Sequence, residues 1–182
     1  MIYFYVFNYS KVLEDVEIEN HITSLFEYLR ANGVEVEFRM EIVRGSLREE
    51  FDKYIKDRSK PFIEHQGVVS VIADFPISNA DARNRRFVFV GEELKTQIKN
   101  EWGESIPNWI AVIKYIEKMN IWHEVAHLLG AEDHYDSMDE NHKALPICGD
   151  PDKCIMTWGK EEGVLCEATL AEIRSSIRTL QG

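Results

Sequence analysis

The chain has 182 residues, of which 45% are hydrophobic and 29% charged, with 32 acidic side chains against 21 basic ones. This length and apolar content favour one folded domain over residues 1–182 and exclude a disordered chain. The net charge of −11 disfavours binding to nucleic acid or to an anionic membrane surface.

Targeting features also bear on location. No apolar run reaches the roughly 18 residues of a membrane-spanning helix, and the first residues lack a basic leader with a cleavage site. Three cysteines are too few for a disulfide scaffold. We therefore expect a cytoplasmic protein without nucleic-acid or membrane partners, and a monomer by default.

The first half of the chain alternates strand-like and helix-like patterns. Residues 2–7 form a continuous apolar run, which predicts a strand buried on both faces. Residues 18–31 have apolar side chains at helical spacing and are followed by Asn32-Gly33, a typical helix stop. Residues 34–42 alternate apolar and polar side chains, as in a strand with one exposed face.

Further elements follow in the same order. Residues 47–55 predict a second amphipathic helix, and residues 68–73 and 87–90 predict short strands. Because strands and helices alternate, we expect an α/β fold with a mixed or parallel sheet.

The second half begins with the longest helical pattern. Residues 108–129 predict a helix, with Pro107 near its start and Gly130 just after its end. A long irregular stretch over residues 131–165 follows, and such a loop in a small domain is usually functional. A final helix is predicted from about Glu167.

The end of the long helical pattern holds two histidines four residues apart. On a helix His123 and His127 lie about 40° apart around the axis and about 6 Å along it, so both imidazoles can bind one ion. Glu124 follows the first histidine and can reach a water molecule on that ion, accept its proton and later deliver it to a leaving amine. This pattern predicts a catalytic zinc ion, which normally takes three protein ligands and one water.

Gly130 indicates where the third ligand lies. A glycine permits the left-handed backbone that ends a helix and turns the chain back. Asp133, three residues later, can then return to the metal, and His134 is the alternative third ligand. The spacing favours Asp133, although histidine is the commoner zinc ligand.

The run from His123 to Asp133 fits the pattern His-Glu-x-x-His-x-x-Gly-x-x-His/Asp, and Cys154-Ile155-Met156 resembles a Met-turn. The sequence thus resembles the metzincin clan of zinc peptidases. Aspartate as third ligand is similar to snapalysins, and the Cys-x-Met turn is similar to archaemetzincins. The chain departs from the archaemetzincin cysteine pattern, since no cysteine stands directly after the third ligand and no later Cys-x-x-Cys is present.

The resemblance implies a metzincin-like α/β (α+β) fold. It implies a twisted, mostly parallel sheet with two helices, an active-site helix, and a loop-rich C-terminal part ending in a helix. The upper subdomain would span about residues 1–130 and the lower about 131–182. Substrate would lie extended and antiparallel to an edge strand, for which residues 87–90 are the candidate.

Two residues near the Met-turn also gain roles from the resemblance. Met156 would support the zinc site from below without binding the ion. Trp158 stands where several metzincins have a tyrosine that contacts the transition state, so it would wall the pocket or donate one hydrogen bond.

We therefore predict a zinc-dependent endopeptidase that acts on peptides or proteins, with one catalytic zinc ion and Glu124 as general base and then acid. The alternatives are a catalytically silent zinc-binding protein of the same fold, or a zinc hydrolase of a small amide or peptide.

The cysteines allow two further arrangements. Cys148 and Cys154 could close a disulfide that braces the loop before Met156. A second zinc site formed by His142, Cys148, Cys154 and Cys166 matches no standard spacing, so we do not expect a second, structural ion.

Overall fold

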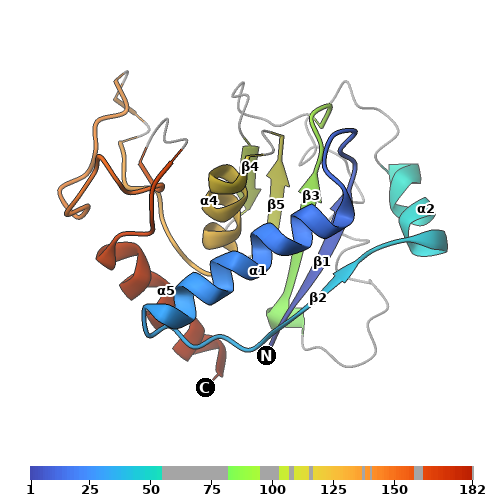
Figure 1. The fold of residues 1–182 in the computed structure, drawn as a ribbon, viewed down its shortest axis with the longest axis horizontal. Helices are drawn as coiled ribbons and strands as arrows, with labels where there is room; N and C mark the ends of the chain where they lie inside the picture. Colours follow the sequence, from blue (N-terminus) through green and yellow to red (C-terminus); the bar gives the residue numbers. More distant parts are fainter. Residues whose placement is uncertain are drawn as a thin grey trace.

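The computed structural model of the chain describes residues 1–54, 82–94, 103–106, 109–114, 117–136, 138–139, 141–157 and 162–181. These residues form a mixed α/β fold around a five-stranded sheet (Figure 1). The strands are β1 (Ile2–Asn8), β2 (Phe38–Ile42), β3 (Arg85–Val90), β4 (Gly103–Ile106) and β5 (Ile110–Ile113). Their order is β2-β1-β3-β5-β4; β4 pairs antiparallel with β5, and the other pairs are parallel.

Strand β1 shows why the sheet is buried on both faces. Successive side chains of a strand point to opposite faces. Phe4 and Val6 therefore join one apolar cluster, and Tyr5 and Phe7 join the other. The strand predicted over residues 2–7 is confirmed, and its continuous apolar run reflects cover on both sides.

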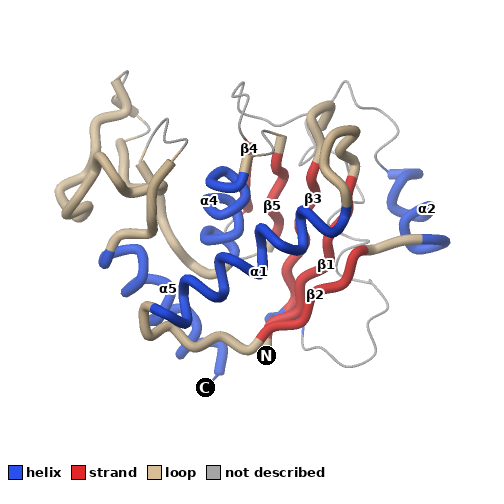
Figure 2. The backbone as a smooth tube through the Cα atoms, in the orientation of Figure 1, coloured by secondary structure: helices blue, strands red, loops and turns tan. Residues whose placement is uncertain are grey.

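Helices supply that cover. The first cluster packs the sheet against α1 (Asp15–Ala31), α4 (Lys118–Leu128) and α5 (Glu167–Gln181). Figure 2 shows α1 crossing the sheet, with α4 beside β4 and β5. On the opposite face, Phe51 of α2 (Gly45–Tyr54) packs against Phe7 and Phe89, with ring centroids 4.5 and 5.6 Å away.

Local sequence sets the ends of α1. Glu14 and Glu17 form a reciprocal capping box at its start, in which the Glu17 carboxylate accepts the Glu14 N–H at 2.8 Å. Gly33 follows its end with a φ of 72°, a backbone conformation that glycine adopts without strain. The predicted helix is confirmed and begins three residues earlier than expected.

The helix predicted over residues 108–129 is wrong in its first part. Ile110–Ile113 form β5, a strand whose four side chains are all buried, and α4 begins at Lys118. A short apolar run looks the same in a buried strand and in a buried helix, so periodicity could not separate them. The β-branched side chains of Ile110, Val112 and Ile113 favour the strand.

Two other predictions need adjustment, and a third falls on residues that the structure does not describe. The strand over residues 87–90 is confirmed as part of β3, but β3 lies between β1 and β5, so its proposal as the substrate-binding edge strand is wrong. In the segment 34–42 only Phe38–Ile42 form a strand. The strand predicted over residues 68–73 lies outside the described residues.

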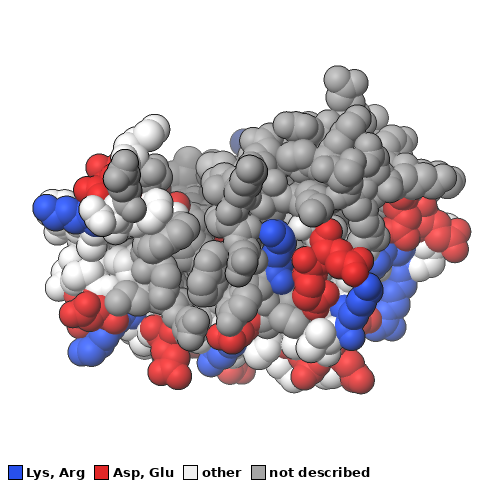
Figure 3. Space-filling view, turned by 90° about the horizontal axis from the view of Figure 1, so that it is seen from above, with Lys and Arg blue, Asp and Glu red and all other residues white. Residues whose placement is uncertain are grey.

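After α4 the chain is irregular until α5, as predicted. Two isolated bridges, Tyr135 with Ala144 and Cys154 with Val164, are the β-pairings described there. Among the described residues, no helix combines the length and the apolar character needed to cross a bilayer. Seen from above, acidic and basic side chains lie next to one another on the described part of the surface (Figure 3), and ion pairs join Lys11 to Glu93 and Arg44 to Asp15.

Candidate metal centre

Helix α4 carries the histidine pair on the face that points away from the core. Its other face is anchored, because Ile121 and Val125 are fully buried and the Trp122 indole donates a 2.9 Å hydrogen bond to the His21 carbonyl of α1. The side chains of His123 and His127 retain 18% and 12% exposure. Packing of α4 therefore fixes the direction in which both imidazoles point.

The end of α4 turns sharply at Gly130. Its φ is 97°, and the next residue, Ala131, donates its N–H to the Ala126 carbonyl at 3.1 Å. The carbonyl of Ala131 in turn accepts a 2.9 Å hydrogen bond from His127 Nδ1. The turn thus both orients His127 and brings Asp133 back towards the helix.

A buried arginine supports the same helix end. Arg86 of β3 is 1% exposed, and its Nε donates to the carbonyl of Leu128, the last residue of α4, at 2.7 Å. Its Nη1 donates at 2.8 Å to the carbonyls of Arg83 and Arg85. A cation at a helix C-terminus also interacts favourably with the helix dipole.

Three atoms of the predicted ligands converge. His123 Nε2 and His127 Nε2 are 3.1 Å apart, and each lies 3.4 Å from Asp133 Oδ1. Ligand atoms about 2.0–2.1 Å from a tetrahedral zinc ion are about 3.3 Å from one another. The three atoms therefore have the spacing of three corners of such a site.

Hydrogen bonding determines what these atoms present to one another. His123 Nδ1 lies 2.8 Å from the Ile155 carbonyl and His127 Nδ1 lies 2.9 Å from the Ala131 carbonyl. A carbonyl can only accept, so both Nδ1 atoms carry hydrogen, and in neutral rings both Nε2 atoms present lone pairs. Asp133 Oδ1 is buried and forms no hydrogen bond to any described residue. A cation held between these electron-rich atoms would satisfy all three, and the spacing fits zinc.

The charged groups around His123 and His127 also favour a cation at this place. Burial acts to lower the pKa of His123, but the Asp133 and Glu124 carboxylates raise it to about 9. Burial acts to raise the pKa of Asp133, but His123 and His127 hold it well below its usual value. The pocket therefore favours a positive charge between these side chains.

Glu124 and Tyr135 complete the surroundings. Glu124 is 5% exposed, close enough for its charge to act on His123. Burial raises the pKa of the Tyr135 phenol, and the charge and hydrogen bonding of Asp133 and the charge of Glu124 raise it further. Sequence reasoning missed Tyr135, although its place two residues after Asp133 was a signal that it could lie nearby.

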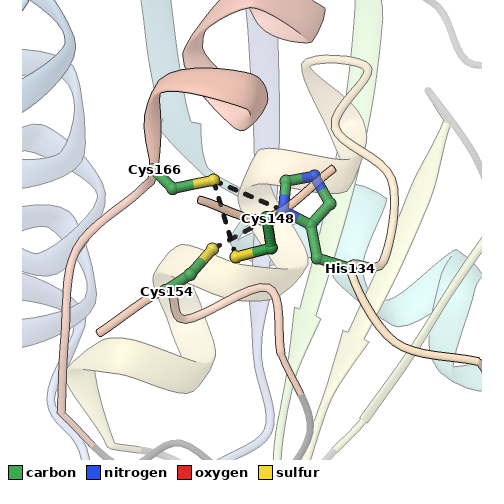
Figure 4. Close-up of side chains that lie close together, drawn as sticks. All are labelled: His134, Cys148, Cys154 and Cys166. Atoms are coloured by element: carbon green, nitrogen blue, oxygen red, sulfur yellow. Dashed lines mark hydrogen bonds between the residues drawn. The ribbon is translucent and has the colours of Figure 1, made fainter. Parts of the chain in front are cut away.

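A second cluster lies beside the first, formed by His134, Cys148, Cys154 and Cys166 (Figure 4). His134 Nδ1 is 3.4 Å from Cys166 Sγ and 3.7 Å from Cys154 Sγ, and the sulfurs of Cys148 and Cys166 are 3.9 Å apart. All four ligand atoms lie within 4.8 Å of one another. Tetrahedral zinc with sulfur ligands spaces such atoms about 3.6–3.8 Å apart, so this set also fits zinc.

Hydrogen bonding prepares His134 and Cys154 for a metal, whereas burial raises the pKa of the Cys148 thiol to about 12. His134 Nε2 is 3.2 Å from a carboxylate oxygen of Glu172, which can only accept, so Nδ1 is left to face the thiols. Burial acts to raise the pKa of Cys154, but its hydrogen bond with His134 lowers it. A lowered pKa favours the thiolate, the form that binds metal.

The structure separates the two candidate third ligands. The Asp133 carboxylate joins the histidine pair, whereas the His134 ring joins the cysteines. The three cysteines come together as the alternative second site required, but the histidine beside them is His134 and not His142. The His142 ring instead lies against Tyr135, with ring centroids 5.6 Å apart.

Other predicted residues near the Met-turn are also located. All three cysteines are free thiols, so the alternative disulfide between Cys148 and Cys154 is not formed. Met156 is fully buried, and its carbonyl accepts the His134 N–H at 2.8 Å. Trp158 lies outside the described residues.

Comparison with known proteins is informative for the fold. No family model matches the sequence, and no curated protein matches it. The fold is similar to the crystal structure of archaemetzincin from Methanopyrus kandleri, with a TM-score of 0.53 and 12% identity over 97% of this chain and 96% of that chain. At this identity the likeness shows the fold alone, and it confirms the predicted α/β architecture.

Proposed function

We propose that this chain is a zinc-dependent endopeptidase of the metzincin type, with His123, His127 and Asp133 as zinc ligands. The observation that carries the proposal is the convergence of two imidazole lone pairs and one buried carboxylate oxygen at 3.1–3.4 Å. The fold shared with archaemetzincin supports the same conclusion.

Zinc bound there would polarise the scissile carbonyl and lower the pKa of the attacking water. The chain's own residues supply the proton transfers and the support. Glu124, nearly buried next to His123, accepts the proton of the water and returns it to the leaving amine. Tyr135 holds the Asp133 carboxylate by hydrogen bonding, and Met156 packs in the core behind the site.

Strand β4 takes the place of β3 as the proposed substrate-binding strand. It is an edge strand, it contacts α4, and it is antiparallel to its neighbour β5. An extended peptide can add to such an edge through backbone hydrogen bonds. We therefore propose that peptide or protein substrates lie along β4 as they pass the histidines.

The number of zinc ions is also part of the proposal. Three buried or half-buried thiols and one imidazole, whose ligand atoms all lie within 4.8 Å of one another, favour a second zinc ion of structural type. This replaces the expectation of a single ion.

Glu124→Gln tests the function. The amide keeps the size of the side chain but cannot accept the proton, so cleavage of casein and of a mixed peptide library should fall by about 100-fold to 10,000-fold. Zinc content should stay at the wild-type level. Glu27→Gln makes the same chemical change on the exposed face of α1 and should leave cleavage unaltered.

The outcomes separate the alternatives. A zinc-loaded wild-type protein that cleaves nothing would be a silent zinc-binding protein. Cleavage of small amides or single peptides, but not of casein, would indicate a narrow hydrolase. Full activity of Glu124→Gln would refute the assigned role of this carboxylate.

A further inference from the structure

The two candidate metal sites are joined through neighbouring residues at two points. We propose that metal bound by the cluster of His134, Cys148, Cys154 and Cys166 positions the ligands of the histidine site, so that the two sites bind metal cooperatively. The inference rests on the two metal sites of the proposed function, and not on catalysis.

The first point is the peptide bond between Asp133 and His134. The two side chains point into different sites, with Asp133 Oδ1 3.4 Å from both histidines and His134 Nδ1 3.4 Å from Cys166 Sγ. Fixing the His134 ring therefore restricts where the Asp133 carboxylate can lie.

The second point is the turn over residues 154–156. Cys154 contributes its sulfur to the cluster, and the next carbonyl, that of Ile155, accepts the Nδ1 hydrogen of His123 at 2.8 Å. The carbonyl after that, of Met156, accepts the His134 N–H at 2.8 Å. Anchoring Cys154 to an ion thus holds the acceptor that sets the tautomer and orientation of His123.

Glu172 of α5 adds a clamp around Asp133. One carboxylate oxygen lies 3.2 Å from His134 Nε2, and the other accepts the backbone N–H of Glu132 at 3.1 Å. These groups belong to the residues immediately before and after Asp133. Glu172 is therefore a positioning residue for the histidine site, although it contacts none of its ligand atoms in these bonds.

Regular secondary structure contributes little to holding this part of the chain, which relies on buried side chains and on single backbone hydrogen bonds. The described residues between α4 and α5 contain isolated bridges and turns but no helix or extended strand. The contacts among the four side chains of the cluster are thiol hydrogen bonds of 3.4–3.9 Å, which are weak. An ion bound by the four side chains should thus add to the order of this segment, because metal-ligand bonds are stronger than these contacts.

Metal titration of the full chain tests the inference without any cleavage assay. Cobalt distinguishes the sites, because a thiolate-bound ion gives sulfur-to-metal charge-transfer absorption and an ion held by nitrogen and oxygen does not. Zinc affinity at each site follows from competition with a chromophoric chelator. Wild-type protein should bind two ions.

Cys148→Ser weakens the cluster without changing a residue at either joining point. We expect it to raise the dissociation constant of the histidine site by about tenfold or more, within the roughly 5–150-fold range of coupling between sites. Coupling is reciprocal, so loss of metal from the histidine site in His127→Ala should in turn weaken metal binding by the cluster. Glu172→Gln should weaken the histidine site while keeping every ligand, and Leu25→Ala, which removes buried side-chain volume in α1, should alter neither constant.

Each outcome decides one claim. A histidine site whose affinity is the same in Cys148→Ser, Glu172→Gln and wild type would overturn the coupling, while leaving the two metal sites and the peptidase proposal intact. Failure of the histidine site to bind metal in wild type would instead overturn the proposed function. If Cys148→Ser does not fold, the comparison of Glu172→Gln with the reciprocal effect of His127→Ala decides the coupling.

Discussion

Replacing Arg86 by methionine should destabilise the protein, although it removes a buried charge. Burial lowers the pKa of Arg86 from 12.5 to about 10, which corresponds to about 3 kcal/mol for keeping the guanidinium charged. Against this stand three hydrogen bonds from a charged donor to backbone carbonyls, each contributing about 1.5–3 kcal/mol. Methionine removes the cost of burying a charge and fills part of the same space, but it leaves the three carbonyls without this donor.

We therefore expect Arg86→Met to lower the free energy of unfolding by roughly 2–4 kcal/mol. Urea denaturation measures this as a lower midpoint at an unchanged m-value. Zinc affinity should fall as well, because His127 lies in the last turn of α4, which ends at the Leu128 carbonyl. Arg178→Met, an exposed site on α5, serves as the matched control.

An unchanged or higher urea midpoint would refute the reasoning. It would mean that the desolvation of Arg86 outweighs its hydrogen bonds, as happens when some buried ion pairs are replaced by apolar side chains.

Three further changes test the metal centre. Tyr135→Phe removes the phenol that hydrogen-bonds Asp133, so isothermal titration calorimetry should show a zinc affinity reduced by about 10–100-fold. An affinity equal to that of wild type would show that this hydrogen bond does not hold Asp133 in place. Gly130→Ala places a side chain on a residue with a φ of 97°, which strains the backbone. Urea denaturation should show a free energy of unfolding lower by about 1–2 kcal/mol. No loss would mean that the turn changes conformation without cost. Zinc at 100 times its dissociation constant should raise the free energy of unfolding by about 2.7 kcal/mol for one site, which corresponds to a melting temperature about 5–11 °C higher. Differential scanning calorimetry measures this increase. No increase would mean that no site binds zinc.

Local patterns predicted much of the fold. The spacing of Ile18, Ile22 and Leu25 was enough to predict α1, and the continuous apolar run of β1 was enough to predict a strand covered on both faces. Strand order is set by contacts between distant segments, which a single sequence does not contain. For this reason β3 could be predicted as a strand but not as a central one.

The candidate metal centre could likewise be predicted only in part. His123, Glu124 and His127 are related by the geometry of one helix, so their spacing sufficed to place them together. Asp133 and His134 are adjacent, and only the packing of the following loop decides which side chain turns to which site. The thiol cluster joins residues up to 32 positions apart, so sequence spacing suggested the wrong histidine, His142.

If the proposed peptidase function holds, the position of β4 at the edge of the described sheet has a consequence for the choice of substrate. Backbone pairing with an edge strand uses main-chain groups, which every polypeptide carries, so this pairing alone discriminates poorly among side chains. Such pairing does require that the incoming segment be extended and that its backbone N–H groups be free of other hydrogen bonds. Selection would then depend on whether a target has a locally unfolded stretch, and tightly folded proteins would be spared.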